Sequence, residues 1–190
     1  MTLEQWFEKG LTFNQYTSLM KVNKENMLQI LERFELEKDD IKLIEQLKEK
    51  QLRAIVLTED WCGDAMLNVP ILVKIAEKAN IDIRFLLRDQ NLELMDQYLT
   101  NGTSRAIPIF IFIDNDGSEK AVWGPRAPKL QQLVDEVRAA LPAKEDPSFA
   151  EKQKETFKKL TKSYVEEAAL WDEVSYSILT TLKDKILYGE

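Results

Sequence analysis

Trp61-Cys62-Gly63-Asp64-Ala65 is the stretch that decides the fold, and it holds the only cysteine of the 190-residue chain. It follows the apolar run Ala54-Ile55-Val56-Leu57, which is typical of a buried strand, and it precedes a segment with helical spacing of apolar residues. A cysteine at a helix start lies beside unpaired backbone N–H groups, and these donors stabilise a thiolate. The stretch therefore predicts a reactive cysteine at a strand-to-helix junction.

This stretch resembles the active-site signature of the thioredoxin family, a Trp-Cys-Gly-Pro-Cys run at such a junction. Trp61, Cys62 and Gly63 match the signature in place. Asp64 stands where the family has proline, and Ala65 stands where it has the second cysteine. The resemblance implies that Cys62 is the catalytic residue and that Trp61, Gly63 and Asp64 contact the substrate.

A second likeness lies in residues 105–112, Arg-Ala-Ile-Pro-Ile-Phe-Ile-Phe. They resemble the family segment in which a cis-proline precedes a central strand and faces the reactive cysteine. Pro108 would be that proline, and Gly124, before a final helix, is a third match. The resemblance implies that the backbone around Ile107 and Pro108 docks an extended peptide beside the sulfur. For Arg105 the interpretations stay open: it would offset nearby acidic charge or contact a carboxylate of the substrate, or it is a plain surface arginine.

The resemblance implies an α/β fold, with a mixed sheet in three α/β/α layers, and the apolar periodicity agrees with it. Residues 39–141 would form this thioredoxin-like domain, between helical extensions over residues 1–38 and 142–190. Thr2 with Gln5, and Thr12 with Gln15, predict capping boxes in the N-terminal extension. The expected strands are 53–58, 81–87, 109–113 and 120–123, and the expected helices of the domain after the first strand are 65–80, 92–100 and 129–141.

The C-terminal extension has apolar residues every three or four positions from Pro147 to Tyr188, which predicts one long helix or two joined helices. Two interpretations of the apolar stripe stay open. It packs on the N-terminal helices or the sheet of its own chain, or it forms a surface for a homodimer or another partner.

Composition excludes several classes of function. A net charge of −7 without a block of lysine and arginine argues against nucleic acid and anionic membrane surfaces as partners. The absence of histidine and the single cysteine exclude histidine triads and histidine or cysteine-cluster metal sites, so we expect no metal and no cofactor. No apolar stretch approaches the ~20 residues that span a membrane. Without a secretory signal or an internal disulfide, the cytoplasm is the expected compartment.

The expected chemistry is monothiol thiol–disulfide exchange. A thiolate attacks a disulfide sulfur and forms a mixed disulfide, which a second cysteine normally resolves. Ala65 cannot do so, and Cys62 would therefore need an outside thiol. The expected partners are protein or low-molecular-weight thiols and disulfides.

Two alternatives remain, because Val56 replaces an aspartate that assists proton transfer in many thioredoxins. The chain would be a redox-inactive thioredoxin-fold module that binds proteins around Trp61 and Pro108, or a sensor whose Cys62 oxidises reversibly.

The charged residues around Cys62 bear on whether this cysteine is redox-active. Asp64 should raise the pKa of the thiol, and with Glu59 and Asp60 it would form an acidic rim that favours cationic partners. Asp64 at the first turn of a helix also has a purely structural interpretation. Because the neighbours are polar or small, we expect Cys62 to be exposed; burial as an inert small hydrophobic residue is the alternative.

Overall fold

The computed structural model of the protein describes residues 1–189. A four-stranded mixed sheet lies at its centre, with strand order β2-β1-β3-β4. β1 pairs in parallel with β2 and antiparallel with β3, and β3 pairs antiparallel with β4. The central strands β1 and β3 are apolar almost throughout because both faces of the sheet are covered. The strands are β1 (Arg53–Thr58), β2 (Asp82–Leu87), β3 (Ile109–Ile113) and β4 (Glu119–Trp123).

Helices make up most of the remainder. The N-terminal part contains α1 (Leu3–Lys9), α2 (Phe13–Leu19), α3 (Lys24–Arg33), the 3-10 turn η1 (Lys38–Asp40) and α4 (Ile41–Lys48). Between the strands lie α5 (Gly63–Ala79), the 3-10 turn η2 (Arg88–Gln90) and α6 (Leu92–Met95). After the sheet come α7 (Pro128–Ala139), α8 (Phe149–Glu166), α9 (Ala168–Leu182) and a final π-helical turn η3 (Lys183–Leu187).

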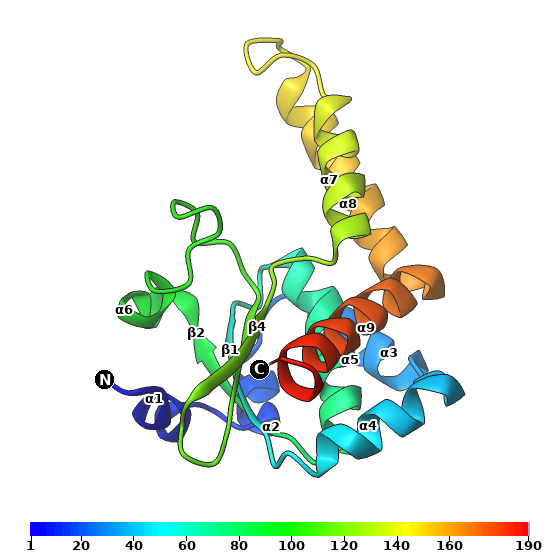
Figure 1. The fold of residues 1–190 in the computed structure, drawn as a ribbon. Helices are drawn as coiled ribbons and strands as arrows, with labels where there is room; N and C mark the ends of the chain where they lie inside the picture. Colours follow the sequence, from blue (N-terminus) through cyan, green and yellow to red (C-terminus); the bar gives the residue numbers. More distant parts are fainter. Residues whose placement is uncertain (190) are drawn as a thin grey trace.

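The helices form a layer on each side of the sheet. α1 and α6 cover one face, and α5 and α9 cover the other (Figure 1). This arrangement confirms the expected α/β fold with a mixed sheet and helical extensions. The predicted strand 53–58 and the predicted strand 109–113 coincide with β1 and β3, since continuous apolar runs of this length fit central strands.

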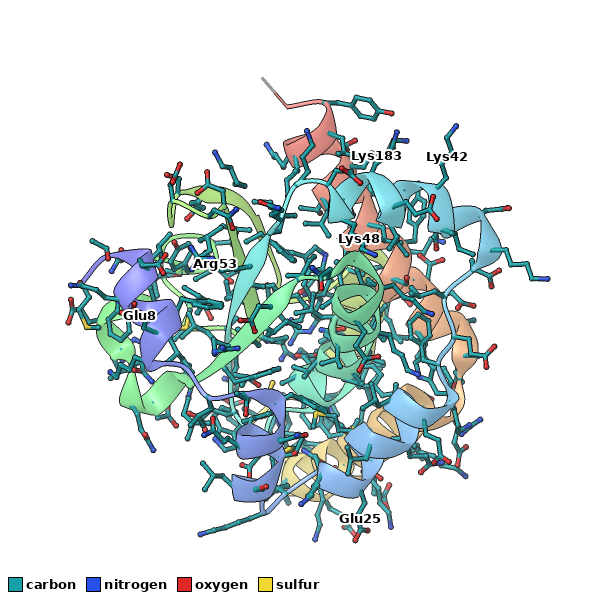
Figure 2. The ribbon with its side chains drawn as sticks, turned by 90° about the horizontal axis from the view of Figure 1, so that it is seen from below. Glu8, Glu25, Lys42, Lys48, Arg53 and Lys183 are labelled. Atoms are coloured by element: carbon teal, nitrogen blue, oxygen red, sulfur yellow. The ribbon has the colours of Figure 1, made fainter. Side chains whose placement is uncertain are left out.

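The N-terminal helices are fixed at both their caps and their faces. Thr2 and Thr12 each form the predicted capping box, with Gln5 and Gln15. Arg53 of β1 extends toward α1 (Figure 2), where its guanidinium makes two hydrogen bonds to Glu4, at 2.7 and 2.6 Å. The N-terminal extension therefore packs directly on the central strand.

Helix α5 places the cysteine. It begins at Gly63, immediately after Cys62, and its residues are almost all buried between the sheet and the helices α3, α4 and α9. Pro70 lies inside the helix, as the sequence predicts. The packing of α5 therefore fixes where Cys62 lies relative to the sheet.

One segment differs from its expected helix, and the C-terminal extension takes the second of its two expected forms. The helix expected over 92–100 ends at Met95, because the backbone N–H groups of Gln97 and Tyr98 bond three residues back, to Leu94 and Met95, and form turns in place of the α-helical ladder. The C-terminal extension forms two helices, α8 and α9. The apolar side chains of α9 are buried within the chain, while α7 and α8 both project beyond the sheet (Figure 1).

Candidate functional site

Cys62 caps the N-terminus of α5. Its Sγ accepts a hydrogen bond from the backbone N–H of Ala65 and donates one to the carbonyl oxygen of Ile107, each over 3.4 Å. The thiol is thus held between the start of α5 and the segment that precedes β3. Only 8% of the cysteine is exposed, so the expectation of an exposed thiol is wrong. The residues beside it in the chain are polar or small, but Ile107 and the helix cover the sulfur from outside the local sequence.

Burial determines whether the Cys62 thiol is protonated. It raises the pKa of Cys62 to about 11, because a charged sulfur would lose its hydration, and the negative charge of Asp64 adds to the rise as expected. The N–H donors of Ala65 and Asp64 and the positive charge of Arg126 act in the opposite direction and do not offset it. At neutral pH the resting site therefore contains a protonated thiol.

The segment opposite the cysteine contains a cis peptide bond between Ile107 and Pro108. Both residues are buried, whereas Ala106 before them is partly exposed and Arg105 is exposed. Gly124 lies against the same segment, with a φ of +131°, and a Cβ there would come within 2.2 Å of the Pro108 carbonyl oxygen. Gly124 therefore allows the loop before α7 to approach Pro108 closely.

Asp64 has a structural role that no proline would supply. Its Oδ2 lies 2.6 Å from Nη2 of Arg126, and its Oδ1 accepts a hydrogen bond from the Tyr164 hydroxyl over 3.1 Å. The side chains of Asp64 and Arg126 are each only 13% exposed. The carboxylate thus joins the start of α5 to the loop before α7 and to the end of α8.

The other two acidic residues of the expected rim are also engaged. Oε1 of buried Glu59 accepts the backbone N–H of Asp89 over 2.9 Å, and burial raises the pKa of the Glu59 carboxyl. Oδ2 of Asp60 accepts the backbone N–H groups of Lys21 and Val22, at 2.6 and 3.2 Å. These contacts use the carboxylates to fix loops, so they do not form the open acidic rim that we expected.

Trp61 is the exposed member of the signature. Its indole is half-exposed and stacks under the guanidinium of Arg88, whose Cζ lies 4.8 Å from the ring centroid. Arg105, by contrast, directs its side chain to Asp96, with contacts of 2.7 and 2.9 Å. Its carbonyl oxygen accepts a hydrogen bond from Arg88, which links the two loops. Arg105 therefore forms a surface ion pair away from the sulfur.

Three residues of the site were not found by sequence reasoning. Arg126 and Arg88 lie in or beside loops with no motif of their own, and Tyr164 was assigned only to the apolar stripe of the C-terminal extension. Among the residues described, no group of three or more cysteine or acidic side chains is placed to hold a metal ion. No helix within residues 1–189 is both long enough and apolar enough to cross a membrane.

Comparisons with known proteins agree with this geometry. A family model described as thioredoxin matches residues 10–138. The fold is similar to the crystal structure of a protein of unknown function from Pseudomonas aeruginosa, with 14% identity, a TM-score of 0.70, and coverage of 96% of this chain and 98% of that one. A crystal structure of an HIV epitope-scaffold gives 15% identity, a TM-score of 0.67 and the same coverages.

The structure of Fasciola hepatica thioredoxin, 23% identical, matches 52% of this chain and 91% of its own length, with a TM-score of 0.34. No curated protein matches the chain. The first two likenesses extend over almost the whole chain, so the helical extensions belong to the shared fold.

Proposed function

Because the chain belongs to the thioredoxin family, we propose that it is a thioredoxin-fold protein-binding module in which Cys62 rests as a buried, protonated thiol. The observation that carries the proposal is the enclosure of Sγ between the Ile107 carbonyl and the Ala65 N–H, with 8% of the residue exposed. A thiolate, not a thiol, attacks disulfides. A thiol in this setting is inert at neutral pH. The proposed activity is therefore protein binding through the surface around it.

The surface proposed for binding begins at Trp61 and continues along residues 105–107. The half-exposed indole offers a large apolar face, and aromatic faces of this kind are frequent anchors at protein interfaces. Within the described residues, the backbone of Ala106 and the N–H of Ile107 make no hydrogen bond to another backbone group, whereas the Ile107 carbonyl accepts a hydrogen bond from the Cys62 thiol. An extended segment of a partner would pair with this backbone beside Trp61. Pro108 and Gly63 would shape the floor, and Asp64 would close one end.

The test is reaction with a small disulfide. Native protein is treated with dipyridyl disulfide at neutral pH, and the mass of the intact chain is measured. The proposal predicts no adduct on the native protein in the time that modifies the urea-unfolded chain completely. Cys62→Ser, which has no thiol, is the control for non-specific modification. Rapid formation of an adduct on the native protein would contradict the proposal.

Monothiol exchange is the second candidate, and the Ala65 N–H favours it because this donor would stabilise a thiolate once the site opened. In that reaction Cys62 Sγ bonds to one sulfur of a disulfide, whose S–S bond breaks and releases a thiolate. An outside thiolate then attacks the substrate sulfur of this mixed disulfide, forms a new disulfide with it and releases Cys62 as a thiolate. Under this alternative the native chain accumulates a mixed disulfide and Ala65→Cys releases the product; under our proposal neither occurs. For both candidates we propose the cytoplasm as the compartment, since the chain forms no internal disulfide.

A further inference from the structure

A groove lies directly beside Trp61, between the start of α5 and the helices α7 and α8. We call it the hairpin groove, after the consecutive helices α7 and α8 that form two of its walls. Its volume is about 380 Å³. This is near the lower end of the ~300–1,000 Å³ of ordinary ligand pockets, enough for one or two side chains. Its walls include Trp61, Val134, Arg138, Phe157, Leu160 and Tyr164.

The groove has both apolar and polar walls, and three of its apolar residues are exposed. Trp61 is 49% exposed, Phe157 is 37% exposed and Val22 is 47% exposed, and all three line the groove. Large apolar side chains that gather around one hollow are typical of a binding surface, whereas scattered ones are ordinary. The groove is therefore suited to an aromatic or large aliphatic side chain.

The uncommitted charge in the groove is positive. The Asp64 carboxylate is already paired with Arg126 and Tyr164. Nε of Arg126 is buried with no hydrogen-bond partner among the residues described. Arg138 is exposed on α7, and within the described part of the chain its side chain forms neither an ion pair nor a hydrogen bond. Two guanidinium groups at an apolar hollow, one of them free, are suited to a carboxylate.

The position of the groove indicates that a peptide chain supplies both the large apolar side chain and the carboxylate. It opens beside Trp61, where the proposed binding surface begins, so a chain that leaves this surface would enter it. One wall comes from α8, which lies beyond residues 10–138 that match the thioredoxin family. The groove is thus an addition of the C-terminal extension to the site.

We propose that the hairpin groove binds an acidic peptide segment, in which an aromatic or large aliphatic side chain lies between Trp61 and Phe157 and the neighbouring carboxylate pairs with Arg138. This inference rests on the proposed binding function and names its partner class. It also reverses the expectation of a cationic partner, because the carboxylates around Cys62 are engaged within the protein.

The test uses the full chain and three synthetic peptides, Gly-Gly-Phe-Glu-Gly-Gly, Gly-Gly-Phe-Lys-Gly-Gly and Gly-Gly-Ala-Glu-Gly-Gly, with blocked ends. Binding is followed by nitrogen-15 NMR through the Trp61 indole signal, which is assigned with Trp61→Phe. The Phe-Glu peptide should bind most tightly. Arg138→Ala and Phe157→Ala should each weaken it about fivefold, whereas Lys144→Ala, which removes a charge from the connection between α7 and α8 outside the groove lining, should leave its Kd unchanged.

The possible failures are distinguishable. If the Phe-Lys peptide binds as tightly as Phe-Glu, or if Arg138→Ala and Phe157→Ala leave the Kd unchanged while Trp61 still responds, the hairpin groove is overturned and the binding function stands. If no peptide perturbs any signal, the acidic-peptide inference is overturned. The proposed resting thiol is then judged separately by its reaction with dipyridyl disulfide.

Discussion

Tyr164, in the last turn of α8, donates its hydroxyl hydrogen bond to Asp64, 100 positions earlier in the chain, over 3.1 Å. Burial and the negative charge of Asp64 both raise the pKa of the tyrosine hydroxyl, so it remains a donor. Because Asp64 lies two residues after Cys62, this bond makes the C-terminal extension part of the site. The carboxylate in the place of the family's proline is therefore a tether between the extension and the start of α5.

The ion pair at this tether should contribute strongly to stability. Arg126→Gln removes the charge that faces the largely buried Asp64 carboxylate, and a buried charge without its partner is costly. We expect the free energy of unfolding to fall by about 3 kcal/mol, measured by urea denaturation. Arg105→Gln is the matched control, since it breaks the exposed pair with Asp96 and should change stability far less. Equal effects of the two substitutions would contradict the structural role of Asp64.

The cap of α5 gives a second prediction. Cys62→Ser keeps a side-chain acceptor for the Ala65 N–H and a donor for the Ile107 carbonyl, so its free energy of unfolding should stay within about 1 kcal/mol of the native value. Cys62→Ala removes the cap and should be about 1 kcal/mol less stable than Cys62→Ser. Urea unfolding of both variants provides the measurement. An alanine variant as stable as the serine variant would show that Sγ does not cap the helix.

The thiol should also make the protein less stable in alkali. The ordinary thiol pKa is 9.0 and that of native Cys62 is about 11, so the unfolded chain loses its proton first as the pH rises. The stabilisation is complete below about pH 9 and declines until about pH 11. Within this window the free energy of unfolding should fall by about 1.4 kcal/mol per pH unit more steeply than in Cys62→Ser.

The comparison with Cys62→Ser isolates this effect. Burial raises the pKa of Tyr16 to about 12, and this tyrosine contributes its own alkaline loss of stability. Burial, the largest cause of that rise, is common to both proteins, so most of the loss cancels in their difference, and only the smaller contribution of the Cys62 charge does not. Parallel pH profiles of the two proteins between pH 9 and 11 would mean that the native thiol pKa is not raised.

Two glycines should respond in opposite ways to alanine. Gly124→Ala places a Cβ at 2.2 Å from the Pro108 carbonyl oxygen, at a positive φ, and should destabilise the protein by more than about 2 kcal/mol. Gly63→Ala introduces a Cβ with nothing within 4 Å in the first turn of α5, and should be neutral or slightly stabilising. Thermal unfolding of the two variants tests this, and a harmless Gly124→Ala would contradict the close packing of this loop on Pro108.

Much of the fold was predictable because its signals are local. Apolar runs define β1 and β3, capping boxes begin α1 and α2, and the signature around Cys62 marks the strand-to-helix junction. The helix expected over 92–100 was too long, because three-residue turns at Gln97 and Tyr98 replace the α-helical ladder after Met95.

The environment of the site was less predictable because it depends on long-range contacts. The polar neighbours of Cys62 suggested exposure, but Ile107 covers the sulfur from 45 positions away. The acidic rim was wrong for the same reason, since Arg126 and Tyr164 reach Asp64 from distant segments. The Trp-Cys-Gly match identified the position of the thiol, and only the folded chain shows its protonation state.

Titration of the single cysteine tests the central claim most directly. Because Cys62 is the only cysteine, the carbon-13 Cβ signal of labelled cysteine reports one thiol across the pH range. We predict a midpoint near pH 11 in the folded protein, with no change at neutral pH. A midpoint well below the ordinary value of 9.0 would reveal an activated thiolate and contradict a resting, protonated thiol in a binding module.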